Sequence, residues 1–303
     1  MRIVGGMFAG AVLLAAGACG PRERTFDADQ SFAHLVAQVE HGPRIPGSPG
    51  HRATLEYMRR HLEPLADRVM LHEFTEISPL DSTEMHLTNV VAVFGAERTS
   101  RLMFGAHWDT RPIADQETVD SLRTQPVPGA NDGASGVAVL LEVARALSRA
   151  EPKVGVDLVF FDGEDSGRDD YPRTFALGSQ RFVKDHPSYR PRIAVILDMV
   201  GRRDARIPRE GTSVTYSGWA VESVWGAARD LGLTVIVDSV GTATFDDHVP
   251  FIEAGIPAVD ILDMRDPAWH TVRDLPENCS PETLGQIGRL VLELIARAEE
   301  EGG

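Results

Sequence analysis

The sequence predicts an α/β fold, in which a single domain contains a mixed, mostly parallel, twisted β-sheet with helices on both faces. From residue 102 onward, short apolar runs of strand length alternate with longer segments of helical periodicity, which is the pattern of successive βα units. Two earlier strand-like runs, 69–77 and 89–94, have no helical segment between them and therefore make the expected sheet mixed. The 303 residues contain neither a repeat nor a long linker, and this length allows one large core.

The segments at the start of the fold are expected to be helical. Residues 29–62 read as helices interrupted by the Gly- and Pro-rich stretch 42–50. Within it, Ser48 and Pro49 give a helix start, because Pro is favoured in the first turn of a helix. Strand-like runs then follow at 69–77, 89–94 and 102–106.

Periodicity and bounding residues predict the later elements. Segment 133–149 is expected to be a helix because its apolar residues share one face at helical spacing; they are Val137, Leu140, Leu141, Ala144 and Leu147. After it we expect strands at 156–161, 193–198, 234–238 and 258–263. Helices are expected at 177–185, 221–231, 249–254 and 281–299, and the polar stretch 166–173 is expected to be a loop.

The formal net charge of −15 argues against a nucleic-acid partner, because such a partner requires a basic face. We take no other information about the substrate from this acidity, which mainly favours solubility.

Residues 1–18 are expected to be a lipoprotein signal peptide, and residues 19–303 the catalytic domain. Arg2 precedes an apolar stretch too short to span a membrane, and small residues stand directly before Cys19. Lipidation of Cys19 would then be the only membrane attachment and would place the protein in the cell envelope, on the periplasmic side. Ala16 stands where such signals usually have Leu, so an ordinary secretory signal remains the alternative. Cys279 is then the only other cysteine, and we expect no intramolecular disulfide.

Acidic and histidine side chains follow several of the predicted strands. Glu164 and Asp165 follow strand 156–161, His107 follows strand 102–106, Asp198 ends strand 193–198, and His270 lies beyond strand 258–263. Sites in open α/β sheets form outside the carboxyl ends of the strands, so we expect these residues to meet. Because side chains alternate along a strand, Glu164 and Asp165 are expected to point in opposite directions, one toward a metal and the other toward a proton.

Asp132, Asp165 and His270 are the expected metal ligands. Asp132 lies in the glycine-rich turn 129–136, and a catalytic zinc site takes three such oxygen and nitrogen ligands and keeps one open position. Asp109 is expected to hold the ring of His107 as an outer carboxylate. Each residue also has an ordinary interpretation: Asp109 as a helix cap or turn residue, and His270 as a loop histidine. The glycine-rich turn lacks the Lys and the glycine spacing of known phosphate-binding loops.

The motifs together resemble the zinc-aminopeptidase superfamily and, within it, the glutaminyl cyclases. The motifs that carry the resemblance are 107–109 (His-Trp-Asp), 129–132 (Gly-Ala-Asn-Asp), 164–165 (Glu-Asp), 178–179 (Gly-Ser), 198–199 (Asp-Met), 247–251 (Asp-His-Val-Pro-Phe), 255–258 (Gly-Ile-Pro-Ala) and 269–271 (Trp-His-Thr). The resemblance covers nearly all of the chain beyond the signal peptide. It implies one zinc ion if the chain is a cyclase and two if it is an aminopeptidase, in which His107 and Asp198 would also be ligands.

Three features favour the cyclase over the peptidase. Gly178-Ser179 follows an extra loop, 166–177, which is similar to the cyclase spacing. Asp246 stands where peptidases commonly have Ser, and Trp269 precedes the metal histidine, as in cyclases. Against these, Asp165 replaces a Glu and Asp260 replaces a His of the animal cyclases, and the loop has no counterpart of the cyclase tryptophan.

The resemblance implies a zinc-dependent enzyme that cyclises the N-terminal glutamine of peptides or proteins to pyroglutamate and releases ammonia. Glu164 would transfer the proton, and Asp198 and Asp246 would share hydrogen bonds with Glu164 or with the substrate amine. Trp269 and His107 are the expected substrate contacts, although Trp269 could also be an ordinary core or rim residue. A two-zinc aminopeptidase that removes N-terminal residues is the alternative. A catalytically inactive binding module is a third possibility, but no ligand or base is missing. The sequence does not give the oligomeric state.

Overall fold

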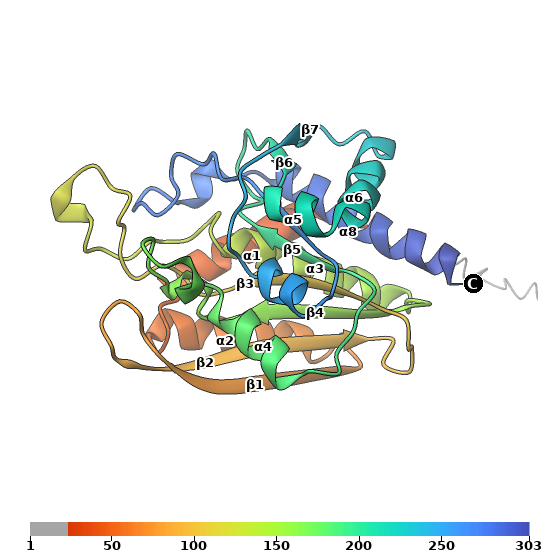
Figure 1. Cartoon of the computed structure of the whole chain (residues 1–303), viewed down its shortest axis with the longest axis horizontal. Helices are drawn as coiled ribbons and strands as arrows, with labels where there is room; N and C mark the ends of the chain where they lie inside the picture. The colour runs from red at the N-terminus through yellow and green to blue at the C-terminus, as the bar shows by residue number, and fades with distance from the viewer. Residues whose placement is uncertain (1–23, 303) are drawn as a thin grey trace, which may run out of the picture.

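A computed structural model describes residues 24–302, and the predicted signal peptide and Cys19 lie outside these residues. A six-stranded sheet forms the centre of the molecule, in the order β1-β2-β4-β3-β5-β8 (Figure 1). Its strands are β1 (Arg68–Ile77), β2 (Glu84–Phe94), β3 (Arg101–His107), β4 (Gly155–Phe161), β5 (Ala194–Asp198) and β8 (Ala258–Leu262). Strands β3, β4, β5 and β8 run parallel to one another, whereas β2 pairs antiparallel with both β1 and β4. The predicted mixed, mostly parallel sheet is therefore confirmed.

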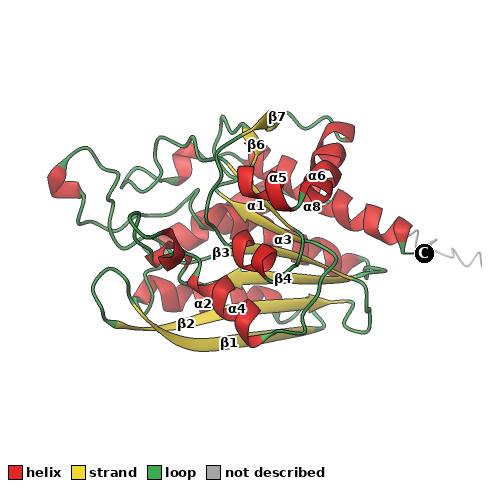
Figure 2. Ribbon diagram, viewed as in Figure 1, coloured by secondary structure: helices red, strands yellow, loops and turns green. Residues whose placement is uncertain are grey.

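Helices cover both faces of this sheet (Figure 2). They are α1 (Ala28–Glu40), α2 (Pro49–Leu62), α3 (Ala134–Arg149), α4 (Leu177–Asp185), α5 (Gly211–Tyr216), α6 (Gly218–Asp230), α7 (His248–Glu253) and α8 (Pro281–Glu301). Side chains of α1, α2, α3, α6 and α8 build the larger core with one sheet face, and α4 and α7 build a smaller core with the other. Neighbouring residues of one strand serve different cores, because strand side chains alternate: Phe160 belongs to the larger core and Phe161 to the smaller.

Local sequence explains where these helices begin. The hydroxyl of Ser48 accepts a hydrogen bond from the backbone N–H of His51, 3.1 Å away, and Pro49 occupies the first turn of α2. Ser280 caps α8 in the same way, and the carboxylate of Asp27 caps α1. Such caps satisfy backbone donors that would otherwise lack partners, and each cap stabilises the folded protein by about 1 kcal/mol.

Three details differ from the sequence prediction. Strand β2 begins at Glu84, because the exposed half of the strand lacks the apolar run that marks its buried half. The short helix α5 and the strand β6 (Ile207–Arg209) were not predicted. Strand β7 (Ile236–Val240) pairs with β6 in a separate two-stranded sheet and therefore does not continue the main sheet.

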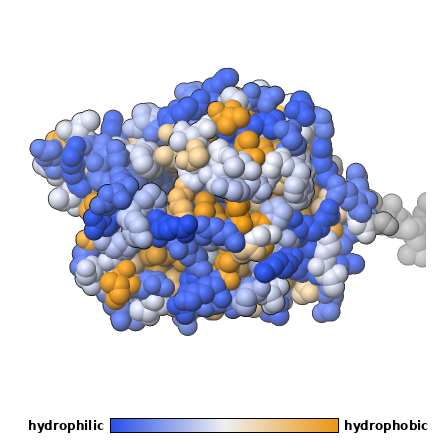
Figure 3. All heavy atoms as spheres, viewed as in Figure 1, coloured by the Kyte–Doolittle hydropathy of each residue, from blue (hydrophilic) through white to orange (hydrophobic). Residues whose placement is uncertain are grey.

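The face seen in Figure 3 is mostly hydrophilic, with apolar side chains gathered near its centre. No helix in the range 24–302 is both long and apolar enough to cross a bilayer.

Candidate active site

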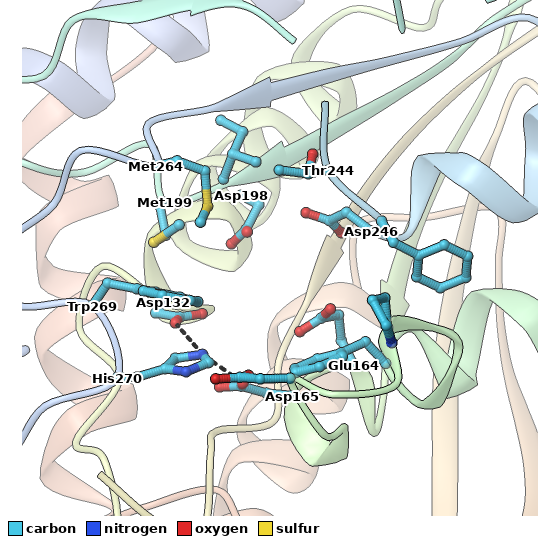
Figure 4. Close-up of a pocket in the computed structure, with 15 residues that line it drawn as sticks. Asp132, Glu164, Asp165, Asp198, Met199, Thr244, Asp246, Met264, Trp269 and His270 are labelled. Carbon is cyan, nitrogen blue, oxygen red and sulfur yellow. Dashed lines mark ion pairs between the residues drawn. The ribbon is translucent and has the colours of Figure 1, made fainter. Parts of the chain in front are cut away.

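The acidic residues that follow the sheet strands border one cavity of about 300 Å³ (Figure 4). Most of its polar wall consists of carboxyl groups, and aromatic rings form much of the remainder. The lining includes Asp132, Glu164, Asp165, Asp169, Asp198, Asp246, His270, Phe175, Phe245 and Trp269. The volume is large enough for one amino-acid side chain and its amine, at the small end of the usual range for ligand pockets. The expectation that the strand-end residues meet therefore agrees with the structure.

Asp132, Asp165 and His270 form a compact group of potential metal ligands. One oxygen of each carboxylate and one ring nitrogen of His270 lie within 4.8 Å of one another. Nε2 of His270 is 3.1 Å from Oδ1 of Asp165 and 3.8 Å from Oδ2 of Asp132, as the dashed lines in Figure 4 mark. All three side chains are buried.

The chemistry of this group fits a zinc ion. Within residues 24–302, neither oxygen of Asp165 nor Oδ2 of Asp132 has a hydrogen-bond donor, and a buried carboxylate without a partner is costly. Burial opposes a charge on His270, yet Asp165 and Asp115 raise the pKa of its ring to about 9. The site therefore favours a positive charge at this position, and two carboxylates with one imidazole are ligands that zinc accepts.

The turn that carries Asp132 is held in place from the far end of the chain. The carboxylate of Asp274 accepts the backbone N–H of Asn131 at 2.8 Å and that of Asp132 at 3.0 Å. A Cβ at Gly133 would lie 2.7 Å from the His107 ring, so only glycine allows this close approach. These contacts explain why the turn before α3 contains glycine, and they hold the backbone from which the carboxylate of Asp132 extends.

His270 is positioned by a residue that the sequence did not single out. Its Nδ1 lies 3.2 Å from Oδ1 of Asp115, and its backbone has a φ of 51°, a conformation that costs a non-glycine residue roughly 1–3 kcal/mol. Nε of Arg111 donates to both oxygens of Asp115 at 3.0 Å, and its Nη1 donates to the backbone carbonyls of Asp165 and Gly167. Arg111 thus connects the partner of one proposed ligand with the backbone of another.

Glu164 and Asp165 diverge for a different reason than the sequence suggested. They do not continue the strand: Gly163 adopts a φ of 76° and starts the 3₁₀ turn Glu164–Ser166. The carboxylate of Asp109 accepts the backbone N–H groups of Glu164 at 3.0 Å and of Asp165 at 3.1 Å. The explanation from strand alternation was therefore wrong, although the two side chains do point to different parts of the cavity (Figure 4).

The expected roles of Asp109 and His107 also need correction. Asp109 mainly anchors the turn that carries Glu164 and Asp165. Nδ1 of His107 lies 3.5 Å from Oδ1 of Asp109, and this nitrogen has no hydrogen-bond partner among the described residues. His107 was expected to contact substrate, but it is 1% exposed and is not one of the described residues that line the cavity. Its Nε2 instead lies 3.0 Å from Asp198 and 3.1 Å from Asp132. It therefore braces these two carboxylates.

Glu164, Asp198 and Asp246 form a second functional group beside the metal-ligand set (Figure 4). Burial and the charge of Asp246 raise the pKa of Glu164 well above its usual value. The same two causes raise the pKa of Asp198 to about 7. Carboxyl groups that are buried together cannot all be ionised, so this group can accept a proton and return it near neutral pH.

Trp269 lines the cavity, as expected, and its ring stacks on that of His270 with 4.0 Å between the centroids. The sequence did not identify the other aromatic walls, Phe175 and Phe245. Phe175 ends the loop after the acidic pair and packs against the guanidinium of Arg111, 5.3 Å from its ring centroid. The loop therefore forms a cavity wall.

Comparisons with known proteins agree with this fold. Residues 89–295 match the sequence profile of peptidase family M28. The chain is 23% identical over 281 residues to glutaminyl-peptide cyclotransferase from Bos taurus, an alignment that covers 82% of this chain and 76% of that protein.

Solved structures are more similar. The glutaminyl cyclase of Tannerella forsythia has a TM-score of 0.86 and 37% identity, covering 89% of this chain and 98% of the other. A Zn-dependent exopeptidase from Parabacteroides distasonis has a TM-score of 0.86 and 36% identity, with the same coverage. The names of these relatives thus divide between cyclases and exopeptidases, and the choice between the two activities depends on the site.

Proposed function

The chain belongs to peptidase family M28, and on this premise we propose that it is a glutaminyl-peptide cyclotransferase. The reaction converts the N-terminal glutamine of a peptide or protein to pyroglutamate. The substrate's α-amine forms a bond to the side-chain amide carbon, and the bond from that carbon to the amide nitrogen breaks, so that ammonia leaves. The curated and structural relatives that bear the cyclase name support this assignment.

Asp132, Asp165 and His270 would hold one zinc ion. When bound, zinc supplies a Lewis acid for the carbonyl of the substrate's side-chain amide. Asp115 orients the ring of His270, and Asp274 fixes the turn that carries Asp132. The protein thus supplies ligands whose directions are set before any substrate arrives.

Glu164 is the proposed proton carrier. It takes a proton from the α-amine as the new bond forms and gives one to the departing ammonia. Its raised pKa suits this role, because a carboxyl group that binds a proton more tightly than usual is a better proton acceptor. Asp198 and Asp246 would accept hydrogen bonds from the amine, and Trp269 would pack against the glutamine side chain. Holding amine and amide in contact supplies a large part of the rate through proximity.

The observation that carries the proposal is the position of Asp246. This carboxyl group enters the cavity together with Glu164 and Asp198, so three acids surround the place where an amine would lie. Such an arrangement suits an amine nucleophile that must lose protons. Phe175, from the loop after the acidic pair, lines the same cavity.

One observation favours an aminopeptidase as the second candidate. His107, Asp132 and Asp198 form another buried group whose ligand atoms lie within 4.8 Å of one another. With two metal ions, Glu164 would activate a water molecule, and the enzyme would release N-terminal residues. In the cyclase, His107 keeps its bracing contacts with Asp132 and Asp198.

Product analysis with the purified full chain distinguishes the two activities. Two peptides that differ only in the first residue, Gln or Leu, are incubated with the zinc-loaded protein. We expect ammonia and a blocked N-terminus from the Gln peptide, and no free amino acid from either peptide. Release of Leu without ammonia from the Gln peptide would contradict the proposal and support the aminopeptidase.

We also propose that Cys19 carries a lipid anchor and that the catalytic domain, residues 19–303, faces the periplasmic side of the cell envelope. The support is the small-residue pattern directly before Cys19. Expression of the Cys19→Ser variant tests it: the variant should lose metabolic labelling with a fatty acid and leave the membrane fraction. Unchanged fractionation and an absence of label in both forms would indicate an ordinary secretory signal.

A further inference from the structure

A second set of ionisable residues extends from Asp246 into the protein interior. It consists of Glu210, His248 and Asp260, which are 3%, 0% and 0% exposed. They come from three separate elements: Glu210 is the N-cap of α5, His248 begins α7, and Asp260 lies in the middle of β8. None of the three is among the described residues that line the cavity. A chain that buries two acids and a histidine here has a large desolvation cost to offset.

Glu210 is the fixed, ionised end of this set. Its carboxylate accepts the backbone N–H groups of Thr212, Ser213 and Thr244 at 2.7, 2.6 and 2.8 Å, and the hydroxyl of Ser213 at 2.8 Å. Burial alone would raise the pKa of Glu210, but His248 and these donors lower it to about 2. A carboxylate with this many donors remains charged throughout the neutral range.

His248 connects Glu210 with Asp260, which lies nearer the active site. Its Nε2 lies 3.1 Å from Oε2 of Glu210, and its Nδ1 lies 3.4 Å from Oδ2 of Asp260. Because Nε2 faces an ionised carboxylate, it is the ring nitrogen that donates its proton toward Glu210. Nδ1 is then free to accept a hydrogen bond from Asp260.

Asp260 faces Asp246 on one side and His248 on the other. Ligand atoms of these three residues lie within 4.8 Å of one another, and neither oxygen of Asp260 has a hydrogen-bond donor among the described residues. The ionisable groups around it are Asp246, Glu210 and Asp198, all acidic, together with His248. Burial and the charge of Asp246 raise the pKa of Asp260 well above its usual value. Two acids in such contact cannot both be ionised, so a proton lies between them.

We propose that Glu210, His248 and Asp260 are positioning residues that keep one proton on Asp260, whose hydroxyl donates to Asp246 and holds that carboxylate toward the substrate amine. This inference rests on the proposed cyclisation for its catalytic consequence, but the location of the proton does not depend on it. No proton is transferred along the set during turnover. The proton on Asp260 keeps Asp246 a hydrogen-bond acceptor next to Glu164, although both side chains are buried.

Two substitutions of Asp260 separate donor from charge. In Asp260→Asn, the amide NH₂ still donates to Asp246, whereas Asp260→Leu keeps the branched shape of the side chain, although it is larger, and has no donor. We expect kcat/KM of Asp260→Asn to stay within about tenfold of the natural protein and that of Asp260→Leu to fall on the order of 100-fold. The acidic limb of the pH profile of kcat/KM should move to higher pH in Asp260→Leu only, because the carboxylate beside the substrate amine then lacks its hydrogen-bond donor. Asp230→Asn, at an exposed position whose side chain is 63% accessible, is the control.

Infrared spectroscopy locates the proton independently of activity. A protonated carboxyl group has a C=O stretching band that carboxylates lack. At neutral pH we expect the difference spectrum between the natural protein and Asp260→Asn, or Asp260→Leu, to contain one such band, and the difference spectrum with Asp230→Asn to contain none. If the band is lost as expected but the natural protein releases no ammonia, the proton assignment stands and the proposed function fails.

The inference is overturned if the band survives in Asp260→Asn, or if Asp260→Asn is as inactive as Asp260→Leu. It is also overturned if both variants lose a bound metal ion that the natural protein holds besides the zinc, because Asp246, His248 and Asp260 would then be metal ligands. Thermal unfolding of each variant shows whether it is folded. If Asp260→Leu does not fold, Glu210→Gln replaces it. The same shift of the acidic limb is expected, because the ring proton of His248 can then move from Nε2 to Nδ1.

Discussion

Asp115 controls the orientation of a proposed zinc ligand without touching the metal, so its replacement tests the site closely. In Asp115→Asn the side chain keeps its shape, but His270 loses the carboxylate that lies 3.2 Å from its Nδ1. Arg111 also loses its charged partner, which it contacts through Nε at 3.0 Å. The change therefore weakens the support of His270 and leaves the ligands themselves unchanged.

The expected effect is a loss of zinc affinity. Removing the outer carboxylate of a metal-bound histidine typically weakens metal binding about 10- to 100-fold, or about 1.4–2.7 kcal/mol. Because the side chain of Asp115 is 25% exposed, solvent screens part of this interaction. We therefore expect about a 10- to 30-fold rise in the zinc dissociation constant.

Competition with a chromophoric zinc chelator measures this constant directly. Asp120→Asn is the matched control, because the Asp120 side chain lies in the same segment and is 98% exposed; its zinc affinity should equal that of the natural protein. Equal affinities for the Asp115→Asn variant, the control and the natural protein would refute the reasoning, because Asp115 would then have no role in holding His270.

Three further predictions concern separate parts of the molecule. Glu164→Gln should bind zinc normally, while ammonia release falls about 10²- to 10⁴-fold because the proton carrier is lost; a fully active variant would remove Glu164 from that role. Trp269→Leu should raise KM about tenfold with a smaller change in kcat, since a stacked aromatic wall contributes about 0.5–1.5 kcal/mol; an unchanged KM would make Trp269 a structural residue only. Burial first, and then the charges of His61 and Arg145, lower the pKa of His34 from 6.5 to about 4. The unfolded chain therefore binds a proton that the folded protein does not, and stability is lost as pH falls through about 6.5 toward 4. Urea unfolding at pH 7 and pH 5 should show a loss about 2 kcal/mol larger for the natural protein than for His34→Gln, with no difference if His34 titrates normally.

The convergence of the site residues was predictable because it depends on topology. Asp198 ends a strand of the parallel part of the sheet, and Asp165 and His270 each follow one; parallel strands present their carboxyl ends at one edge. The glycine-rich turn added Asp132, since such a turn allows close backbone approach. These residues all border the same cavity.

The supporting residues could not be predicted in this way. Arg111, Asp115 and Asp274 lie in irregular segments, where no periodicity indicates which way a side chain points. Their roles depend on contacts between parts of the chain that are far apart in sequence, such as the pairing of Asp274 with the backbone of Asp132. Polar residues in loops are common, so composition alone does not distinguish these three from surface residues.

The incorrect expectations have a related cause. His107 follows a strand just as Asp165 does, but α3 packs over it, with Gly133 against its ring. No periodicity or motif indicated that this histidine would be covered and would brace two carboxylates. Similarly, the turn at Gly163 changed the directions of Glu164 and Asp165, whereas the prediction assumed that the strand continued.

A zinc titration of the metal-free enzyme tests the central claim most directly. Purified protein is stripped of metal, zinc is added in steps, and ammonia release from a Gln peptide is followed at each step. Activity that rises linearly and reaches its plateau at one zinc per chain is the result expected for a site formed by Asp132, Asp165 and His270. A plateau reached only at two zinc ions per chain, or saturation with zinc without any release of ammonia, would contradict a one-zinc glutaminyl cyclase.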